Sequence, residues 1–358
     1  MRPLDELPSR RPSRRALLRG AAAAGAALPL SACGPVRIGQ PTSYTPPPPG
    51  IDDLYRQDLL ALLDQALALG ALAAPDSVLA ADDLLLRIRD ALSAQRDALL
   101  TGAEAEEIES AAPSPSSATA GAPIDGAATP APADLPAGAG AQELSDLLIR
   151  IRDLAAQAAR QVSGSLARPV LAIAAHETWA AGRLAYLGAA AAPAPAPEAG
   201  QIVPVRDVPA SDPPSIGASV DYDQALEAAQ EDEWYAGYMH EVLAASASGA
   251  QRQALLEEAA GNRERAQQLG QFALADGAPE VRRAAVYPVP GGELSAQTLA
   301  ALPVQLATAL LQDHAALAGA APFERRPLPI AAALSQAERL APLVTALPPL
   351  PSLETGTE

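Results

Sequence analysis

Three histidines, His176, His240 and His314, are the first candidates for chemistry, because an imidazole can transfer protons or bind a metal. Each lies in a segment whose apolar residues recur at helical spacing. A helix presents residues i and i+3 on one face, so a Glu-x-x-His pair can direct two ligands at one metal ion. The positions three residues before the histidines hold Ile173, Gly237 and Leu311. None is a glutamate, so the sequence lacks the di-iron motif of helical bundles.

Two of these histidines precede a glutamate directly, as His176-Glu177 and His240-Glu241. Adjacent side chains on a helix point about 100° apart, so neither pair converges on one substrate or metal. We expect each histidine to lie on a bundle surface or to be partly buried with a hydrogen-bond partner. The chain also has no Gly-x-Ser-x-Gly motif, no glycine-rich phosphate loop and no lysine. We therefore expect neither catalysis nor a cofactor.

Carboxylates beside an aromatic stripe are weaker candidates. On a helical wheel, Glu231 lies in the middle of a stripe formed by Glu227, Trp234, Tyr235, Tyr238 and Val242. The opposite stripe is small and aliphatic, with Leu226, Ala229, Ala236 and Leu243. Glu231 is either a remnant ligand or an acid with a raised pKa, or it is an exposed glutamate beside aromatics that pack on a neighbour. The exposed interpretation is favoured. If a metal binds, its candidate ligands are Glu231, Asp232, Glu264 and His314, the last placed near Glu231 across the bundle.

The single cysteine, Cys33, has a different chemistry, because a thiol can be acylated. It follows Leu30-Ser31-Ala32, which resembles the lipobox of bacterial lipoproteins, where the cysteine takes up a diacylglyceryl group and becomes the new N-terminus. Upstream, Arg14 and Arg15 in Ser-Arg-Arg-Ala-Leu-Leu form a twin-arginine export signal. The alanine-rich run after them is shorter than the roughly 20 apolar residues of a membrane span. We predict a protein exported by the twin-arginine route and anchored through lipid, palmitate included, on the extracytoplasmic face of the cell membrane.

The charge of the chain limits its partners. Removing residues 1–32, which hold six arginines, Asp5 and Glu6, changes the net charge from −17 to −21. Nucleic acids require clustered cationic side chains, so we expect no nucleic-acid partner. An acidic body is equally unsuited to binding an anionic membrane surface, so membrane contact is expected to come from lipid on Cys33.

Proline-rich and alanine-rich stretches divide the chain into segments. We predict a signal peptide at residues 1–32, a tether at 33–50, an N-terminal helical bundle at 51–188 with a disordered insert at 112–140, a linker at 189–216, a C-terminal four-helix bundle at 217–347 and a tail at 348–358. Apolar residues at helical spacing, proline and glycine breaks and the absence of sustained alternation predict an all-α fold. We expect helices at about 52–72, 76–100, 142–162, 168–187, 219–246, 249–276, 295–318 and 329–345. The fold class is therefore two tandem four-helix bundles separated by linkers.

The C-terminal block resembles a ferritin-like domain family of unknown function found in exported lipoproteins of high-GC bacteria. The resemblance rests on three stretches: Ala228 to Tyr238, Gly261 to Ala266 and Val286 to Pro290. It implies a ferritin-like bundle, and Asn262 stands where the family has a histidine. Together these features predict a non-catalytic binding module with a protein partner in the envelope. The alternative is a ferritin-like protein that binds iron through carboxylates.

Overall fold

In the computed structural model, residues 49–72, 83–111, 139–207 and 219–353 are described. Most of these residues are helical, and no strand occurs among them, which confirms the all-α prediction. Alanine and leucine, both strong helix formers, dominate the helices. The predicted signal peptide and most of the tether, including Arg14, Arg15 and Cys33, lie outside the described residues, as does most of the predicted insert at 112–140. Within the described part, no helix is long and apolar enough to cross a membrane.

The helices follow the predicted segments closely where the structure describes them, and residues 76–82 of the helix predicted at 76–100 lie outside the described residues. They are α2 (Ile51–Leu72), α4 (Leu84–Leu99), α5 (Gly102–Ala111), α6 (Ala139–Gln161), α7 (Gly164–Tyr186), α8 (Ser219–Ser246), α9 (Gly249–Asp276), α10 (Ala296–Ala320) and α11 (Pro327–Leu343). Local signals set several ends. The Ser295 hydroxyl accepts a hydrogen bond from the Thr298 amide and caps α10. Gly277, at a φ of 76°, ends α9 in the left-handed region that glycine adopts at little cost. Sequence patterns did not predict α5.

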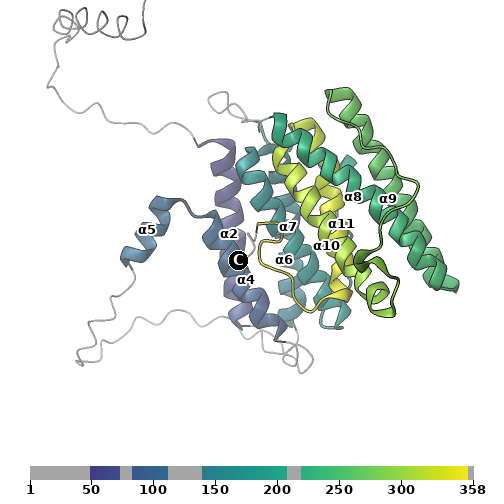
Figure 1. The fold of residues 1–358 in the computed structure, drawn as a ribbon. Coiled ribbons are helices and arrows are strands. Elements are labelled where there is room, and N and C mark those ends of the chain that lie inside the picture. Colours follow the sequence, from purple (N-terminus) through teal and green to yellow (C-terminus); the bar gives the residue numbers. More distant parts are fainter. Residues whose placement is uncertain (1–48, 73–82, 112–138, 208–218, 354–358) are drawn as a thin grey trace, which may run out of the picture. The chain divides into compact units, whose positions relative to one another are not determined.

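Helices from both predicted bundles share one hydrophobic core. In Figure 1, α6, α7, α10 and α11 form the middle, with α2 and α4 on one side and α8 and α9 on the other. The largest cluster of buried apolar side chains draws on α2, α4, α6, α7, α10 and α11 together. Helix α7 is buried on nearly every side, with Trp179 1% exposed. The arrangement as two tandem four-helix bundles is not confirmed, because α7 packs against α10 and α11 of the second predicted bundle.

The segment 189–207, predicted as part of a linker, lies against this core. Ile202 is only 2% exposed, and Ala196 packs on the core cluster. The Arg152 guanidinium donates to the Ala194 carbonyl at 2.8 Å, and the Ala196 amide donates to Glu338 at 2.5 Å. The small apolar residues of this segment can therefore pack, and side chains of α6 and α11 bond its free backbone groups.

The first residues of the predicted tail also lie on the helices. The His176 ring donates from Nδ1 to the Pro348 carbonyl at 2.9 Å, and the Gln95 amide donates to the Pro349 carbonyl at 3.0 Å. Pro351 is buried. Proline carbonyls keep their acceptor capacity although the residue has no amide donor, so side chains of α7 and α4 can hold this segment through its carbonyl groups.

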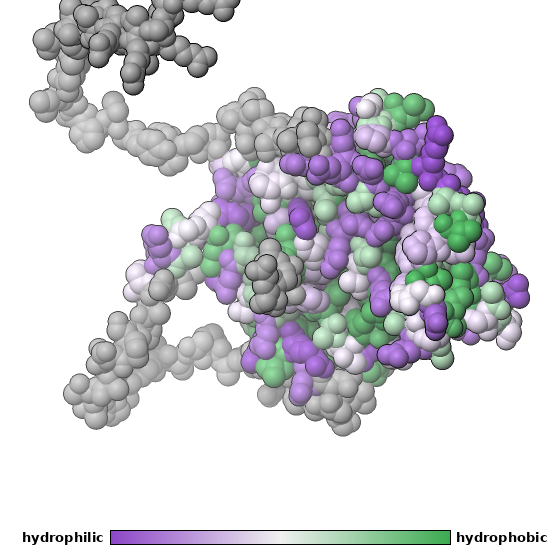
Figure 2. Space-filling view, in the orientation of Figure 1, coloured by the Kyte–Doolittle hydropathy of each residue, from purple (hydrophilic) through white to green (hydrophobic). Residues whose placement is uncertain are grey.

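Large exposed apolar side chains are scattered. Leu274 and Val286 are the most exposed of them in the described part, at 80% and 71%. On the face that Figure 2 displays, hydrophobic residues form small patches between hydrophilic ones. Single exposed apolar residues are normal on soluble helices, so these do not mark an interface by themselves.

Candidate functional site

A layer of polar side chains crosses the interior where α8, α9, α10 and α11 meet. On α8 the layer separates two apolar clusters, one around Leu226 and Ala229 and the other around Ala236 and Met239. Glu233 lies between them on the same stripe, at spacings of three and four residues. On α10, the polar residues Asp313 and His314 lie between Leu310 of one cluster and Leu317 of the other. Both helices therefore bring polar groups to one level of an otherwise apolar interior.

Glu233 and His314 form the centre of this layer, and neither is exposed to solvent. Oε1 of Glu233 accepts a hydrogen bond from His314 Nε2 at 2.7 Å and another from Arg265 Nε at 2.6 Å. Burial alone would raise the pKa of Glu233. The hydrogen bonds and positive charge of His314 and Arg265 outweigh burial and hold that pKa below its usual range. Glu233 is therefore a buried carboxylate whose counter-ion is supplied by the chain itself.

Other polar atoms in the layer have no hydrogen-bond partner among the described residues. They include Oε2 of Glu233, Nδ1 of His240 and both polar atoms of the Asn262 side chain. Burial, followed by the charge of Arg339, lowers the pKa of His240 to about 4. Arg339 itself forms an ion pair with Glu258, which links α11 to α9. His240 is thus a neutral ring among charged neighbours that are already paired.

A pair of aspartates lies at the edge of the layer. Asp313 on α10 shares a hydrogen bond with Asp232 on α8, which requires one proton between the two carboxyl groups. Burial, this hydrogen bond and the negative charges of Asp232 and Glu233 raise the pKa of Asp313 to about 8. Two carboxyl groups in close contact cannot both ionise cheaply, so Asp313 keeps its proton at neutral pH.

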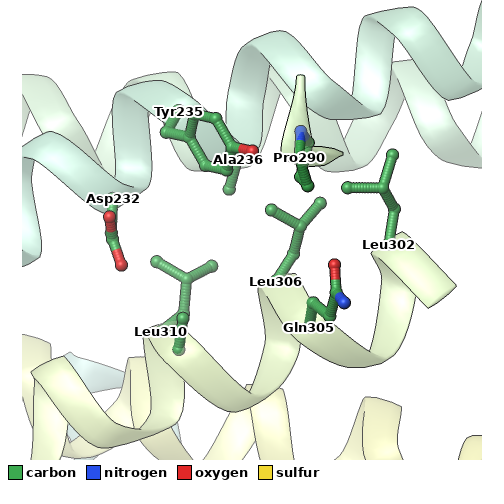
Figure 3. A pocket seen from close by; sticks show the side chains of 9 residues that line it. Asp232, Tyr235, Ala236, Pro290, Leu302, Gln305, Leu306 and Leu310 are labelled. Atoms are coloured by element: carbon green, nitrogen blue, oxygen red, sulfur yellow. The ribbon is translucent and has the colours of Figure 1, made fainter. Parts of the chain in front are cut away.

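A pocket opens beside this acid pair, between α8 and α10. Its volume is about 140 Å³, and it is lined by Asp232, Tyr235, Ala236, Pro290, Leu302, Gln305, Leu306, Ala309 and Leu310. Figure 3 shows the Asp232 carboxylate at one end, the Gln305 amide toward the other, and Leu306 and Leu310 between α10 and the Tyr235 ring. Pro290 belongs to the segment that follows α9. The Tyr287 ring of this segment meets Tyr235 edge to face and Tyr238 at a tilt, with ring centroids 6.0 and 5.5 Å apart. The pocket is apolar, with an acid at one end.

A second group of buried polar residues lies on α7, beneath the segment 348–349. Glu177 is fully buried, and neither of its carboxyl oxygens has a hydrogen-bond partner in the described part of the chain. Burial raises the pKa of Glu177 to about 8, against the opposing effect of the Gln95 amide. Burial also lowers the pKa of His176 to about 4. At neutral pH both side chains are therefore uncharged, as an apolar interior requires.

The structure separates the four metal candidates. Glu231 and Glu264 are exposed, and Glu264 accepts a hydrogen bond from Gln268 on the surface. Asp232 lies at the pocket and His314 in the interior, where its partner is Glu233. Among the described residues, no group of three or more histidines, cysteines or acids is placed to hold a metal ion.

The sequence patterns did not indicate Glu233, Asp313 or Arg265 as site residues. A signal for Glu233 existed, since it lies four residues after Ala229 and three before Ala236, on the aliphatic stripe of α8. The aromatic residues beside Glu231 lie on the opposite stripe of α8. The histidines were expected on a bundle surface or partly buried with a hydrogen-bond partner. His176 and His314 are more deeply buried than that, at 2% and 0% exposure, and each has a hydrogen-bond partner.

No protein family, curated protein or solved structure matches this chain.

Proposed function

We propose that this protein is a lipid-anchored component of the cell envelope whose helical body binds a ligand or partner without catalysing a reaction. The observation that carries this proposal is the apolar pocket between α8 and α10, which opens beside a polar layer whose Glu233 is already neutralised by Arg265 and His314. A carboxylate held by two donors is a poor nucleophile or base. The pocket therefore offers binding surface more readily than reactive groups.

We further propose that α8, α9, α10 and α11 form a degenerate ferritin-like bundle. Extensive contacts pair α8 with α9, α8 with α10 and α10 with α11. The ion pair of Arg339 with Glu258 joins α11 to α9 and completes the circuit of four. In this proposal the polar layer occupies the level at which such bundles hold metals, and Arg265 supplies the positive charge there.

Anchoring is tested by replacing the one acylable thiol. Cys33→Ser should abolish incorporation of labelled palmitate and release the protein from the membrane fraction, because two acyl chains give stable anchoring where the acidic body adds no electrostatic attraction. Replacing both Arg14 and Arg15 by lysine should block export. A Cys33→Ser protein that still takes up label and sediments with membranes would overturn the lipoprotein proposal.

Binding is tested by filling the pocket. Full-length protein is purified in mild detergent and analysed by native mass spectrometry for a stoichiometric bound molecule, alongside Leu306→Trp and the smaller change Ala309→Leu. We expect the wild type to retain a molecule that both variants lose while they keep the helical circular dichroism spectrum of the wild type. Equal retention by all three proteins, or none by any, would contradict binding at this pocket.

A further inference from the structure

The pocket between α8 and α10 has the size of one small ring. Its volume of about 140 Å³ is close to that of engineered protein cavities of about 150 Å³ that take up benzene. Leu302, Leu306 and Leu310 line one side along α10, and the Tyr235 ring faces them from α8. Such walls favour an apolar group of about six carbon atoms.

The charge at this pocket has one sign. Asp232 is the one carboxylate among the lining residues, while its neighbour Asp313 keeps a proton at neutral pH and Glu233 is paired with His314. Arg265 of the polar layer is engaged by Glu233. The end of the pocket at Asp232 therefore presents a negative charge that no side chain lining the pocket neutralises.

We propose that this pocket binds a small organic ammonium ion, with its apolar group between Tyr235, Leu306 and Leu310 and its ammonium group on the Asp232 carboxylate. This inference rests on the proposed function and names the chemical class of its ligand. An ammonium donor replaces the hydrogen bonds that Asp232 would otherwise make with water, and a charge-assisted bond of this kind is about twice as strong as a neutral one.

Other occupants fit the pocket less well. A neutral hydrocarbon of the same size would desolvate the Asp232 carboxylate without pairing it, which is costly for a charged group. An anion would meet the Asp232 carboxylate at close range and be repelled. The combination of an apolar wall with an acid at one end thus selects a cation over its neutral and anionic analogues.

Ligand-observed NMR titration of the full-length protein in detergent at pH 7 tests this proposal with three probes of equal shape: benzylammonium, benzyl alcohol and benzoate. We expect benzylammonium to bind at least tenfold more tightly than benzyl alcohol, and benzoate not to bind. Asp232→Asn should weaken benzylammonium binding about tenfold and leave benzyl alcohol unchanged. Glu231→Gln is the matched control, since it removes the same charge from the neighbouring, exposed position and should change neither affinity. Leu306→Trp should abolish binding of both.

Equal affinities for benzylammonium and benzyl alcohol, or equal effects of Asp232→Asn and Glu231→Gln, would overturn the assignment of an ammonium ligand. If a neutral bound molecule is then found that Leu306→Trp displaces, the proposed binding function stands and only the ligand class is wrong. If neither probes nor a native ligand respond to Leu306→Trp, both proposals fail.

Discussion

Nε2 of His314 lies 2.7 Å from Oε1 of Glu233, and neither residue is exposed to solvent. The same oxygen accepts a second hydrogen bond from Arg265 at 2.6 Å, so one carboxylate joins α8, α9 and α10. A buried ion pair adds little net stability compared with an apolar replacement of the whole group, but removing one partner leaves an uncompensated charge. The packing of these three helices therefore depends on Glu233.

Replacing Glu233 alone should destabilise the protein strongly. Glu233→Ala leaves the Arg265 guanidinium without its carboxylate and His314 without its acceptor, and we expect the free energy of unfolding to fall by about 3–5 kcal/mol. Urea denaturation followed by circular dichroism measures the loss. Glu231→Ala, two positions away and exposed, should change stability by less than about 0.5 kcal/mol. Similar losses for the two variants would show that Glu233 does not hold the layer together.

Glu177 should make the protein less stable as the pH rises. Burial raises its pKa to about 8, well above its usual value, so at intermediate pH the folded state keeps a proton that the unfolded state has released. Stability from this group is complete at acid pH and is lost as the pH rises through about 8, by at most about 1.4 kcal/mol per pH unit. Asp313, with its pKa also raised to about 8, acts in the same direction.

Unfolding free energies measured between pH 7 and pH 8.5 test this dependence. Glu177→Gln should reduce the slope, and the double variant with Asp313→Asn should reduce it further. Glu264→Gln, an exposed acid, serves as the control and should keep the slope of the wild type. A slope unchanged in the double variant would contradict the prediction.

His176 should act in the opposite direction at acid pH. Burial lowers the pKa of His176 to about 4, whereas its usual value is near 6.5. Between pH 6.5 and pH 4 the unfolded state therefore binds a proton that the folded state does not bind. Stability from this group is present above about pH 6.5 and is lost as the pH falls toward 4. His176→Gln keeps a donor for the Pro348 carbonyl but cannot titrate, so it should lose less stability between pH 7 and pH 5. His240, whose pKa is also lowered, should account for part of the remaining dependence of stability on pH, and His240→Gln should remove that part. If each single variant kept the full pH dependence of the wild type, the buried histidines would not be its source.

Arg326 should be a strong contributor to stability, although it lies outside the candidate site. Its buried guanidinium donates to the carbonyls at the end of α6, Ala159 at 3.3 Å and Val162 at 2.5 Å, and to Ala321 after α10 at 2.9 Å. Arg326→Met leaves these carbonyls without a hydrogen-bond donor, and we expect the free energy of unfolding to fall by about 3 kcal/mol. Arg325→Met, which removes a more exposed ion pair with Asp276, should cost less than about 1 kcal/mol. Thermal and urea unfolding of both variants measure the difference, and equal costs would refute the role of Arg326.

The shared core predicts that the two halves do not fold apart. A fragment of residues 49–207 exposes the face of α7 that packs on α10 and α11, and we expect it to bind a hydrophobic dye and to unfold without a cooperative transition. The full chain should unfold cooperatively. A fragment that is monomeric, fails to bind the dye and unfolds sharply would restore the prediction of two independent bundles.

The helices could be predicted because their signals are local. Helical spacing of apolar residues, capping residues such as Ser295 and breaks such as Gly277 act within a few positions, so α8 and α9 begin and end where the sequence indicates. The packing of α7 could not be predicted in this way. Its residues are apolar almost all round, so no stripe indicates which neighbours bury it.

The sequence by itself determined that this chain forms helices, that it contains no lysine chemistry and that Cys33 is its one acylable thiol. Only the tertiary structure decided that Glu233, and not Glu231, faces His314, because that depends on which stripe of α8 meets α10. A shift of two residues along a helix turns a side chain by about 200°, which separates an interior charge from an exposed one. Interactions between residues close in the sequence determine the helix, but the burial that changes the pKa of a carboxylate comes from helices that are distant in the chain.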